Sequence, residues 1–393
     1  MTSPVFATQY LETLPTLITP AAALHRLREA FARLPISMVL LGWDLPPKFD
    51  EVIADETARQ GAQLYRWQPW LTSDARTDLP PEWAVVGPDS TPIPGYNNDP
   101  AFSFVCPNHS GVADLLEERL SSIAARGIFQ GVFLDRIRFP SPVDDPAKRL
   151  GCFCRYCTRL AGASLDLEPV RRYLLSSLSN KASARQLVCS LLGSSDSPGS
   201  PLETFLDFRA SSITRTIASA KRQAASLSLS LGLDCFSPAL TRMVGQDLQL
   251  LDSVCDWIKL MTYPRVFGPA GLPFELLGLA SWLVRTGWTE PEAIGILSDA
   301  TGLTFPENLT VLRQSGLKSG VIAHEVEYGR TLGVTHLLAG IALAVTNHAY
   351  KPTLEQVQAD IIATRNADGL VISWDLWLTP MEHLDTIRTL WEL

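Results

Sequence analysis

Short apolar runs alternate with amphipathic stretches along most of the chain. Continuous apolar or β-branched runs are typical of strands buried on both faces, and apolar positions three and four residues apart are typical of covering helices. We predict eight strands, at 36–42, 63–67, 102–106, 131–135, 227–235, 257–263, 338–345 and 369–374. Helical patterns separate most of them, at 21–32, 112–125, 168–178, 204–225, 240–251, 274–284 and 354–363. This alternation predicts an α/β fold, a (β/α)8 TIM barrel, with a doubly wound sheet as the runner-up.

Two segments interrupt the alternation. Residues 73–100 contain six prolines and predict a long loop after the second strand, and residues 190–201, SLLGSSDSPGSP, predict a linker between two helices. Residues 289–333 have a mostly helical pattern that does not place the individual helices. We therefore predict one barrel domain over residues 1–393, with insertions at about 73–100 and 190–201. Ordered loops of this length are usually functional.

Polar and aromatic side chains gather where the predicted strands end. In a (β/α)8 barrel these ends meet at one face, where the active site is built. Sugars offer apolar ring faces to aromatic side chains, and their hydroxyls bind carboxylates, amides and guanidinium groups. We predict a carbohydrate site lined by Trp43, Asp44, Trp67, Trp70, Asn108, Arg136, Arg138, Tyr263, His348 and Trp374. For any single tryptophan, packing in the core is an equally good explanation.

Asp135 is the leading candidate for the reaction itself. It ends the run GVFLD, and the charges of Arg136 and Arg138 favour the ionised form that a nucleophile or base requires. Glycosidic cleavage also needs an acid, and Asp234 is our candidate because its apolar setting, LSLGLDCF, favours a raised pKa. Asp375 and Asp44 are the next candidates. For every aspartate except Asp135, a helix cap or a bond to loop amides is the better explanation of the residue taken alone.

The chain has seven cysteines, and three of them form a C-x-C-x-x-C array at Cys152, Cys154 and Cys157. Three thiols within six residues do not make a spread-out disulfide framework, and their spacing is typical of tetrahedral zinc sites. Cys106 ends the third predicted strand, one barrel position before the loop that carries this array, and adjacent loops can bring it close as the fourth ligand. We predict that these four thiolates hold a structural Zn2+ that fastens a long loop. The alternative is a set of unliganded, partly buried thiols.

The charge and the apolar runs of the chain limit the kinds of partner that we expect. The net charge of −8, without a strong cluster of basic residues, repels phosphate backbones, so we expect no nucleic-acid partner. No apolar run is long enough to cross a bilayer. The N-terminus lacks a basic region, and Glu12 lies where a secretory signal has its apolar core, so we predict a cytoplasmic protein. Phosphate-loop and serine-hydrolase motifs are absent, and the oligomeric state stays open.

The segment 131–140, GVFLDRIRFP, resembles the G-V/I-x-L-D-x-I-R-[YF]-P strand of a family of glycoside-hydrolase-like TIM-barrel proteins. The likeness extends in the same order to WQPW, FVCPN, LMTYP and VISWDLW, from about residue 35 to the C-terminus. The resemblance implies a barrel, hydrolysis of glycosidic bonds and Asp135 as the active-site carboxylate. The cysteine array is similar to the structural zinc site of one family of TIM-barrel β-galactosidases. No glutamate ends a predicted strand, which argues against the β-galactosidase-like clan with its glutamates on the fourth and seventh strands.

Three function classes remain. The preferred one is a glycoside hydrolase with a pair of aspartates at the C-terminal face of the barrel. The second is a degenerate barrel that binds carbohydrate and keeps the zinc, and it predicts no second carboxyl group within about 10 Å of Asp135. The third is an enzyme in which the cysteine-bound metal is catalytic, and it requires an open coordination position near Asp135.

Overall fold

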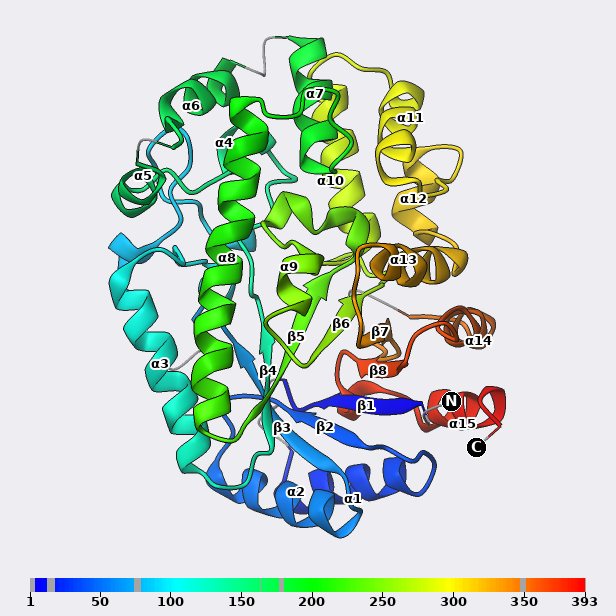
Figure 1. Cartoon of the computed structure of the whole chain (residues 1–393). Helices are drawn as coiled ribbons and strands as arrows, with labels where there is room; N and C mark the ends of the chain where they lie inside the picture. Colours follow the sequence, from blue (N-terminus) through cyan, green and yellow to red (C-terminus); the bar gives the residue numbers. More distant parts are fainter. Residues whose placement is uncertain are drawn as a thin grey trace.

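Eight parallel strands close into a barrel in which each strand pairs with its neighbours in sequence and β1 pairs with β8 (Figure 1). The computed structural model describes residues 4–12, 18–73, 79–162, 164–176, 180–346 and 351–392. The strands are β1 (Val5–Tyr10), β2 (Met38–Leu41), β3 (Gln63–Pro69), β4 (Gly131–Asp135), β5 (Ser230–Phe236), β6 (Trp257–Met261), β7 (Leu337–Ala342) and β8 (Gly369–Ser373). The predicted (β/α)8 TIM barrel is confirmed.

Helices surround the barrel and extend beyond one end of it. They are α1 (Pro20–Phe31), α2 (Pro47–Arg59), α3 (Ser110–Ala125), α4 (Pro146–Arg149), α5 (Arg155–Ala161), α6 (Leu167–Ser176), α7 (Lys181–Leu191), α8 (Pro201–Ser226), α9 (Leu248–Asp252), α10 (Leu272–Arg285), α11 (Glu290–Thr301), α12 (Leu309–Ser315), α13 (Gly320–Thr331), α14 (Leu354–Ala363) and α15 (Met381–Leu390). The long helix α8 begins where the Ser200 hydroxyl accepts a hydrogen bond from Glu203 N, with Pro201 at the first helical position. In the described part of the chain, no helix is both long and apolar enough to span a membrane.

One predicted strand is wrong and one real strand is missing from the prediction. Residues 102–106 form only isolated bridges, Thr72 with Phe104 and Ala84 with Val105. The strands on either side of this segment, β3 and β4, pair directly with each other. The missing strand is β1, which lies between β8 and β2, with Val5 paired to Gly369 and Ala7 to Met38. A barrel strand needs a partner on both sides, and the sequence of 102–106, although typical of a strand, finds these partners only in its own loop.

The core has two layers, one inside the barrel and one between the strands and the helices. Inside the barrel the rings of Phe133 and Trp257 stack with centroids 5.2 Å apart. The other members of this inner layer are Ala7, Met38, Leu40, Trp43, Tyr65, Trp67, Leu338 and Val371. Because both faces of the strands are buried, their sequences are nearly continuous apolar runs, which is why most of them are recognisable.

A charged side chain lies among these apolar groups. Lys259 on β6 is fully buried, and its ammonium group donates hydrogen bonds to Gln9 Oε1 (2.7 Å) and Asp234 Oδ2 (3.0 Å). Gly340 on the neighbouring strand β7 leaves room for it, because a Cβ atom at this position would lie 2.3 Å from Lys259 Cε. A glycine inside a buried strand here marks the close approach of a side chain.

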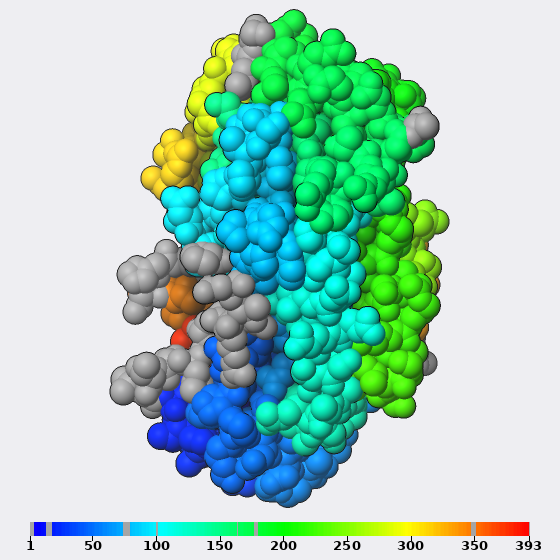
Figure 2. All heavy atoms as spheres, turned by 90° about the vertical axis from the view of Figure 1, so that its left-hand side faces the viewer, coloured from blue at the N-terminus to red at the C-terminus, as the bar shows by residue number. Residues whose placement is uncertain are grey.

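Two long insertions follow β3 and β4. The first spans residues 70–109 and contains the bridges named above, and the second spans 136–200 and carries α4 to α7. Figures 1 and 2 show them stacked together beyond the barrel strands, green and cyan over the blue N-terminal part. The predicted insertion at 73–100 lies in the first, although residues 74–78 are outside the described part. Residues 190–201 are the junction between α7 and α8, at the end of the second.

Candidate active site and metal centre

A cavity of about 80 Å3 opens at the carboxyl ends of the strands, where the barrel fold places active sites. It brings together seven of the predicted side chains, namely Trp67, Asp135, Arg136, Arg138, Asp234, Tyr263 and Trp374. It also includes Gln9 and Glu12 from β1 and the segment after it, and Phe102 from the first insertion, which the sequence analysis did not assign to a site.

Asp135 ends β4 and is held by hydrogen-bond donors on two sides. Trp67 Nε1 donates to Asp135 Oδ2 at 3.3 Å, and the backbone N–H of Arg136 donates to Asp135 Oδ1. Arg136 has a left-handed backbone conformation with φ +55°, which costs about 1–2 kcal/mol for a residue other than glycine. This turn directs the Arg136 amide back toward the carboxylate.

The Arg136 guanidinium lies between two carboxyl groups. Its Nε is 4.0 Å from Asp135 Oδ2 and its Nη2 is 3.8 Å from Glu12 Oε1. Because one guanidinium lies within 4.0 Å of both, the two carboxyl groups are at most about 10 Å apart, a limit that allows the separations of about 5 to 9.5 Å found in glycosidase carboxyl pairs. Asp135 therefore shares the cavity with two further carboxyl groups, that of Glu12 and that of Asp234.

Glu12 lies just past the end of β1. Burial raises the pKa of its carboxyl group to about 7, the Arg136 guanidinium opposes this rise, and the carboxylates of Asp135 and Asp375 add to it. The side chain keeps 28% of its surface exposed, which leaves it accessible from the cavity. The expectation that no glutamate follows a barrel strand is wrong, because it depended on a strand list without β1.

Asp375, a predicted catalytic residue, binds backbone amides. Its carboxylate accepts hydrogen bonds from the N–H groups of Leu11 (2.9 Å), Glu12 (3.2 Å) and Trp377 (2.9 Å). Burial raises the pKa of Asp375, and these three amides oppose the rise. Asp375 thus fixes the segment that carries Glu12. This is the other explanation given for such aspartates in the sequence analysis, a carboxylate that binds the amides of a loop.

Asp234, the predicted acid, lines the deep wall of the cavity with only 3% of its side chain exposed. Burial raises its pKa to about 7, although the Lys259 ammonium at 3.0 Å pulls the pKa down. The Asp234 carboxylate in turn raises the pKa of Lys259 against the effect of burial, so the lysine stays charged. The two side chains form an ion pair beneath the cavity.

Replacing Lys259 with methionine should lower the free energy of unfolding by about 3–5 kcal/mol at pH 8, because Asp234 is left as an unpaired buried carboxylate. A carboxyl group with a raised pKa binds a proton more readily in the folded state, so stability falls as pH rises through the window between 3.8 and about 7. Without the lysine the pKa of Asp234 rises further, so the fall in stability should continue to higher pH, and the loss measured by urea unfolding should shrink at pH 5. Adding Asp234→Asn should recover stability at pH 8, and a double variant with simply additive losses would contradict the ion pair.

Two further predicted residues line the cavity as buried polar groups. Burial raises the pKa of Tyr263 to about 12, so its hydroxyl is a donor at neutral pH, and its ring lies 6.2 Å from that of Trp374. Burial lowers the pKa of Arg138 to about 10, which still leaves it charged. Its guanidinium carbon lies 4.5 and 4.6 Å from the rings of Phe104 and Phe236.

The remaining predicted lining residues lie elsewhere. Asp44 and Trp43 line an outer hollow of about 400 Å3 between α2 and α3, although the Trp43 ring also contacts the edge of Trp67 with centroids 5.3 Å apart. Trp70, which is 1% exposed, and Asn108 line another of about 560 Å3 between α3 and α8. We place the site in the smaller cavity because the paired carboxyl groups line it. His348 is outside the described residues.

The residues that sequence reasoning missed had weak signals. Predicting Glu12 and Gln9 as site residues requires that VFATQY be recognised as a strand. Its period-two pattern is interrupted by polar residues on both faces. Lys259 stands alone in the apolar run WIKLM, and a buried lysine requires a partner, which is the signal that points to Asp234.

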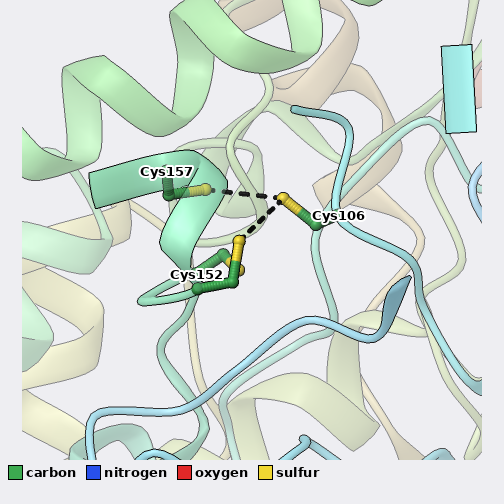
Figure 3. A group of neighbouring side chains, drawn as sticks. Cys106, Cys152 and Cys157 are labelled. Carbon is green, nitrogen blue, oxygen red and sulfur yellow. Dashed lines mark hydrogen bonds between the residues drawn. The ribbon is translucent and has the colours of Figure 1, made fainter. Parts of the chain in front are cut away.

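The four predicted metal ligands come together between the two insertions (Figure 3). Cys106 comes from the first insertion, and Cys152, Cys154 and Cys157 come from the second, with Cys157 on α5. The sulfur of Cys106 lies 3.4 Å from that of Cys157 and 3.6 Å from that of Cys154, and all four sulfurs lie within 4.8 Å of one another. These distances are far longer than the roughly 2.05 Å of a disulfide, so the cysteines are free thiols.

The cluster fits a tetrahedral metal ion. Four thiolates bound at about 2.3 Å to one zinc ion have sulfurs about 3.8 Å apart, close to the distances seen here. Asn108 Nδ2 donates to Cys157 Sγ (3.2 Å) and Val86 N donates to Cys152 Sγ (3.4 Å), as outer groups do when they orient metal ligands. Asn108, predicted to bind substrate, therefore supports the thiol cluster.

The fold of the chain can be compared with those of known proteins. It aligns over 99% of its length with all of a class V chitinase from Pseudomonas fluorescens Pf-5, at 11% identity and a TM-score of 0.51. It aligns over its whole length with 49% of α-L-fucosidase isoenzyme 2 from Paenibacillus thiaminolyticus, at 12% identity and a TM-score of 0.51, and so spans about half of that chain. Its fold is similar to that of glycoside hydrolase barrels. At these identities the likeness establishes the fold alone, and no protein family and no curated protein matches the sequence.

Because the fold alone does not establish an activity, the chemistry has to be argued from the residues of the cavity. The cavity offers one carboxyl group with a pKa of about 7, on Glu12, and a second on Asp135 across the same guanidinium. It also offers ring faces from Trp67 and Trp374 beside the hydroxyl of Tyr263. Such a set can give a proton to one atom, present a carboxylate to another, and bind a molecule with both apolar and hydroxyl surface.

Proposed function

We propose that this chain is a glycoside hydrolase in which Glu12 is the general acid and Asp135 is the nucleophile or the base. The observation that carries the proposal is the Arg136 guanidinium, which lies within 4.0 Å of both carboxyl groups at the mouth of the barrel. The glycoside hydrolase barrels with the same fold support the class of reaction.

The two carboxyl groups have different tasks. Breaking a glycosidic bond requires a proton for the leaving oxygen, and an acid with a pKa of about 7 retains that proton near neutral pH. Glu12 supplies it, and its carboxylate becomes paired with Arg136 once the proton has left. Asp135 either attacks the anomeric carbon or takes a proton from the attacking water, with its oxygens oriented by Trp67 and the Arg136 amide.

Glu12 takes the role of acid in preference to Asp234 and Asp375. Asp234 has a similar pKa, but only 3% of its side chain is exposed against 28% for Glu12, and Lys259 holds one of its oxygens. The Asp375 carboxylate accepts hydrogen bonds from three backbone amides. In this proposal Asp234 and Lys259 support the floor of the cavity, and Asp375 positions Glu12.

The four cysteines hold a structural Zn2+ in this proposal. Four thiolates complete a tetrahedral shell, so no coordination position is left for water or substrate. This closed shell favours a scaffolding ion over the catalytic-metal alternative. When bound, the ion supplies only the link between the two insertions that carry its ligands.

Hydrolysis of aryl glycosides and oligosaccharides by the purified zinc-loaded protein tests the function. A panel of α- and β-linked substrates should contain at least one that is cleaved, with kcat/KM well above that of Asp135→Asn prepared in the same way. Calorimetric titration with the same oligosaccharides separates cleavage from binding. Binding without release of reducing sugar across the panel would favour the noncatalytic barrel instead.

A further inference from the structure

The segment 101–106, which we call the strap, reaches from the cavity to the thiol cluster. Its sequence is AFSFVC, and Phe102, Phe104 and Cys106 alternate with other residues along it. Ala101 and Phe102 end a short 3-10 turn, η3 (Pro100–Phe102). Beyond it the strap is held by two bridges, Phe104 with Thr72 and Val105 with Ala84.

One end of the strap contacts the arginine that lies between the paired carboxyl groups. Arg136 Nη1 donates a hydrogen bond of 2.5 Å to the Ala101 carbonyl oxygen, and the guanidinium carbon lies 4.7 Å from the centre of the Phe102 ring. On its other side the same carbon lies 5.4 Å from the Trp43 ring. These contacts, with 7% of Arg136 exposed, determine where the guanidinium stands between Glu12 and Asp135.

The middle of the strap contacts the second arginine of the cavity. The Arg138 guanidinium carbon lies 4.5 Å from the Phe104 ring, and Arg138 is 5% exposed. A buried guanidinium flanked by aromatic rings has few alternative positions, so a displacement of the strap has to be transmitted to it.

The other end of the strap is fixed at the thiol cluster. Cys106 is 1% exposed and its sulfur contacts those of Cys154 and Cys157. Its backbone N–H donates to the Trp83 carbonyl (2.7 Å), and the N–H of Val105 donates to the Leu71 carbonyl (2.9 Å). The hydrogen bonds of Cys106 and Val105 lead into the first insertion, so at this end the strap is joined to the second insertion by the thiol cluster, in addition to the contacts of Ala101, Phe102 and Phe104 with Arg136 and Arg138.

We propose that the strap is a positioning element through which a metal ion on the four cysteines sets the place of Arg136 between Glu12 and Asp135. The proposal builds on the glycoside hydrolase function only for its kinetic readout. With the metal bound, Cys106 is tied to the second insertion and Ala101 and Phe102 are held against the guanidinium. Without the metal, the end at Cys106 is released and the contacts of Ala101 and Phe102 with the Arg136 guanidinium loosen, while those with Thr72 and Trp43 remain. Phe102 is the positioning residue that makes this link.

The test compares the side-chain Nε–H NMR signal of Arg136 in zinc-loaded protein, in chelator-stripped protein and in zinc-loaded Phe102→Ala. The signal is assigned by its loss in Arg136→Lys. Removing zinc from the wild type should shift or broaden it, and Phe102→Ala should show the same change while still holding about one zinc per chain. Ser103→Ala, at the next residue of the strap, is the control and should leave the signal in place.

Kinetics add a readout that a merely structural role would not move. In zinc-loaded Phe102→Ala, kcat should fall about 10- to 100-fold with little change in KM, because a displacement of about 1 Å in a positioning group costs that much. An Arg136 signal unchanged by zinc removal would overturn the proposal whatever Phe102→Ala shows, because Phe102 contacts the guanidinium directly. If the stripped protein unfolds, zinc-loaded Cys106→Ser, which unties the strap while three thiolates remain, replaces it, and an unchanged Arg136 signal in that variant would overturn the proposal. A protein without hydrolytic activity would refute the glycoside hydrolase function. The NMR comparison would still test whether the strap positions Arg136.

Discussion

Replacing Glu12 with glutamine should lower kcat/KM for an unactivated glycoside by about 100- to 10,000-fold, the contribution of a well-placed general acid. Glutamine keeps the shape of the side chain and a hydrogen-bonding oxygen for Arg136, but it has no proton to give. The loss should be far smaller for aryl glycosides whose leaving group departs without protonation. Steady-state rates on a pair of substrates with poor and good leaving groups measure this difference.

The pH profile gives an independent check on Glu12. The acid acts in its protonated form, and its pKa of about 7 predicts that activity falls as pH rises above about 7. The variant should lack this fall. Because the folded state binds the Glu12 proton more tightly than the unfolded state does, burial of Glu12 destabilises the protein increasingly as pH rises from 4.5 to about 7. Glu12→Gln should therefore be at least as stable as the wild type at pH 8, so lost activity cannot be ascribed to unfolding.

Matched controls separate the roles of the carboxyl groups. Glu51→Gln, on the exposed side of α2, is the same chemical change outside the cavity and should leave kcat/KM and its pH profile unchanged. Asp135→Asn should lose activity on both good and poor leaving groups, since its carboxylate is needed in either case. Equal losses in Glu12→Gln for both leaving groups, or an unchanged fall above pH 7, would remove Glu12 from the role of acid.

Loss of the metal should be the largest change in stability available in this chain. Purified protein should contain about one zinc ion per chain, and Cys154→Ser should lose it together with more than about 4 kcal/mol of unfolding free energy, since losing a metal is one of the few single changes that reach this size. The physical reason is that the ion joins two insertions that come from different strands. Metal analysis and urea unfolding with and without chelator measure the two effects.

Cys189 on α7 provides the control for this prediction. It is a free cysteine outside the cluster, so Cys189→Ser should keep the zinc and lose less than about 1 kcal/mol. Chelator should lower the stability of Cys189→Ser as it does that of the wild type, and should have no effect on Cys154→Ser. Full zinc occupancy in Cys154→Ser would mean that the four-thiolate site is wrong.

The barrel and the cysteine cluster could be predicted from the sequence because their signals are local. Strands such as β4 and β8 are buried on both faces and so have apolar sequences, and Cys152, Cys154 and Cys157 lie within a few residues of one another. Predicting Cys106 as the fourth ligand requires one further inference, namely that consecutive loops of a barrel are neighbours. It was reached although residues 102–106 are not a barrel strand, because the loop they belong to still follows β3.

The proposed acid could not be predicted because it depends on distant partners. Val5–Tyr10 and residues 102–106 have similar strand-like composition, and only pairing with β8 and β2 distinguishes the first from the second. Glu12 becomes a candidate once β1 is known, and its raised pKa follows from burial and from the carboxylates of Asp135 and Asp375, far away in the sequence. Asp375 and Asp234 were recognised as important aspartates, but their hydrogen bonds to Leu11 and Lys259 are visible only in three dimensions.

The hydrogen bond from Glu12 N to Asp375 joins residues 363 positions apart. On a ribosome the proposed acid is therefore made long before the side chain that holds it. Contacts of such separation form late, since the loop between them must close first. A chain stalled before β8 would already have every strand that carries Asp135 and Asp234, and it would still lack a placed Glu12. In the proposed enzyme, hydrolytic turnover would then begin only after β8 has joined β1 and closed the barrel, which makes activity a sensitive assay for this step of folding.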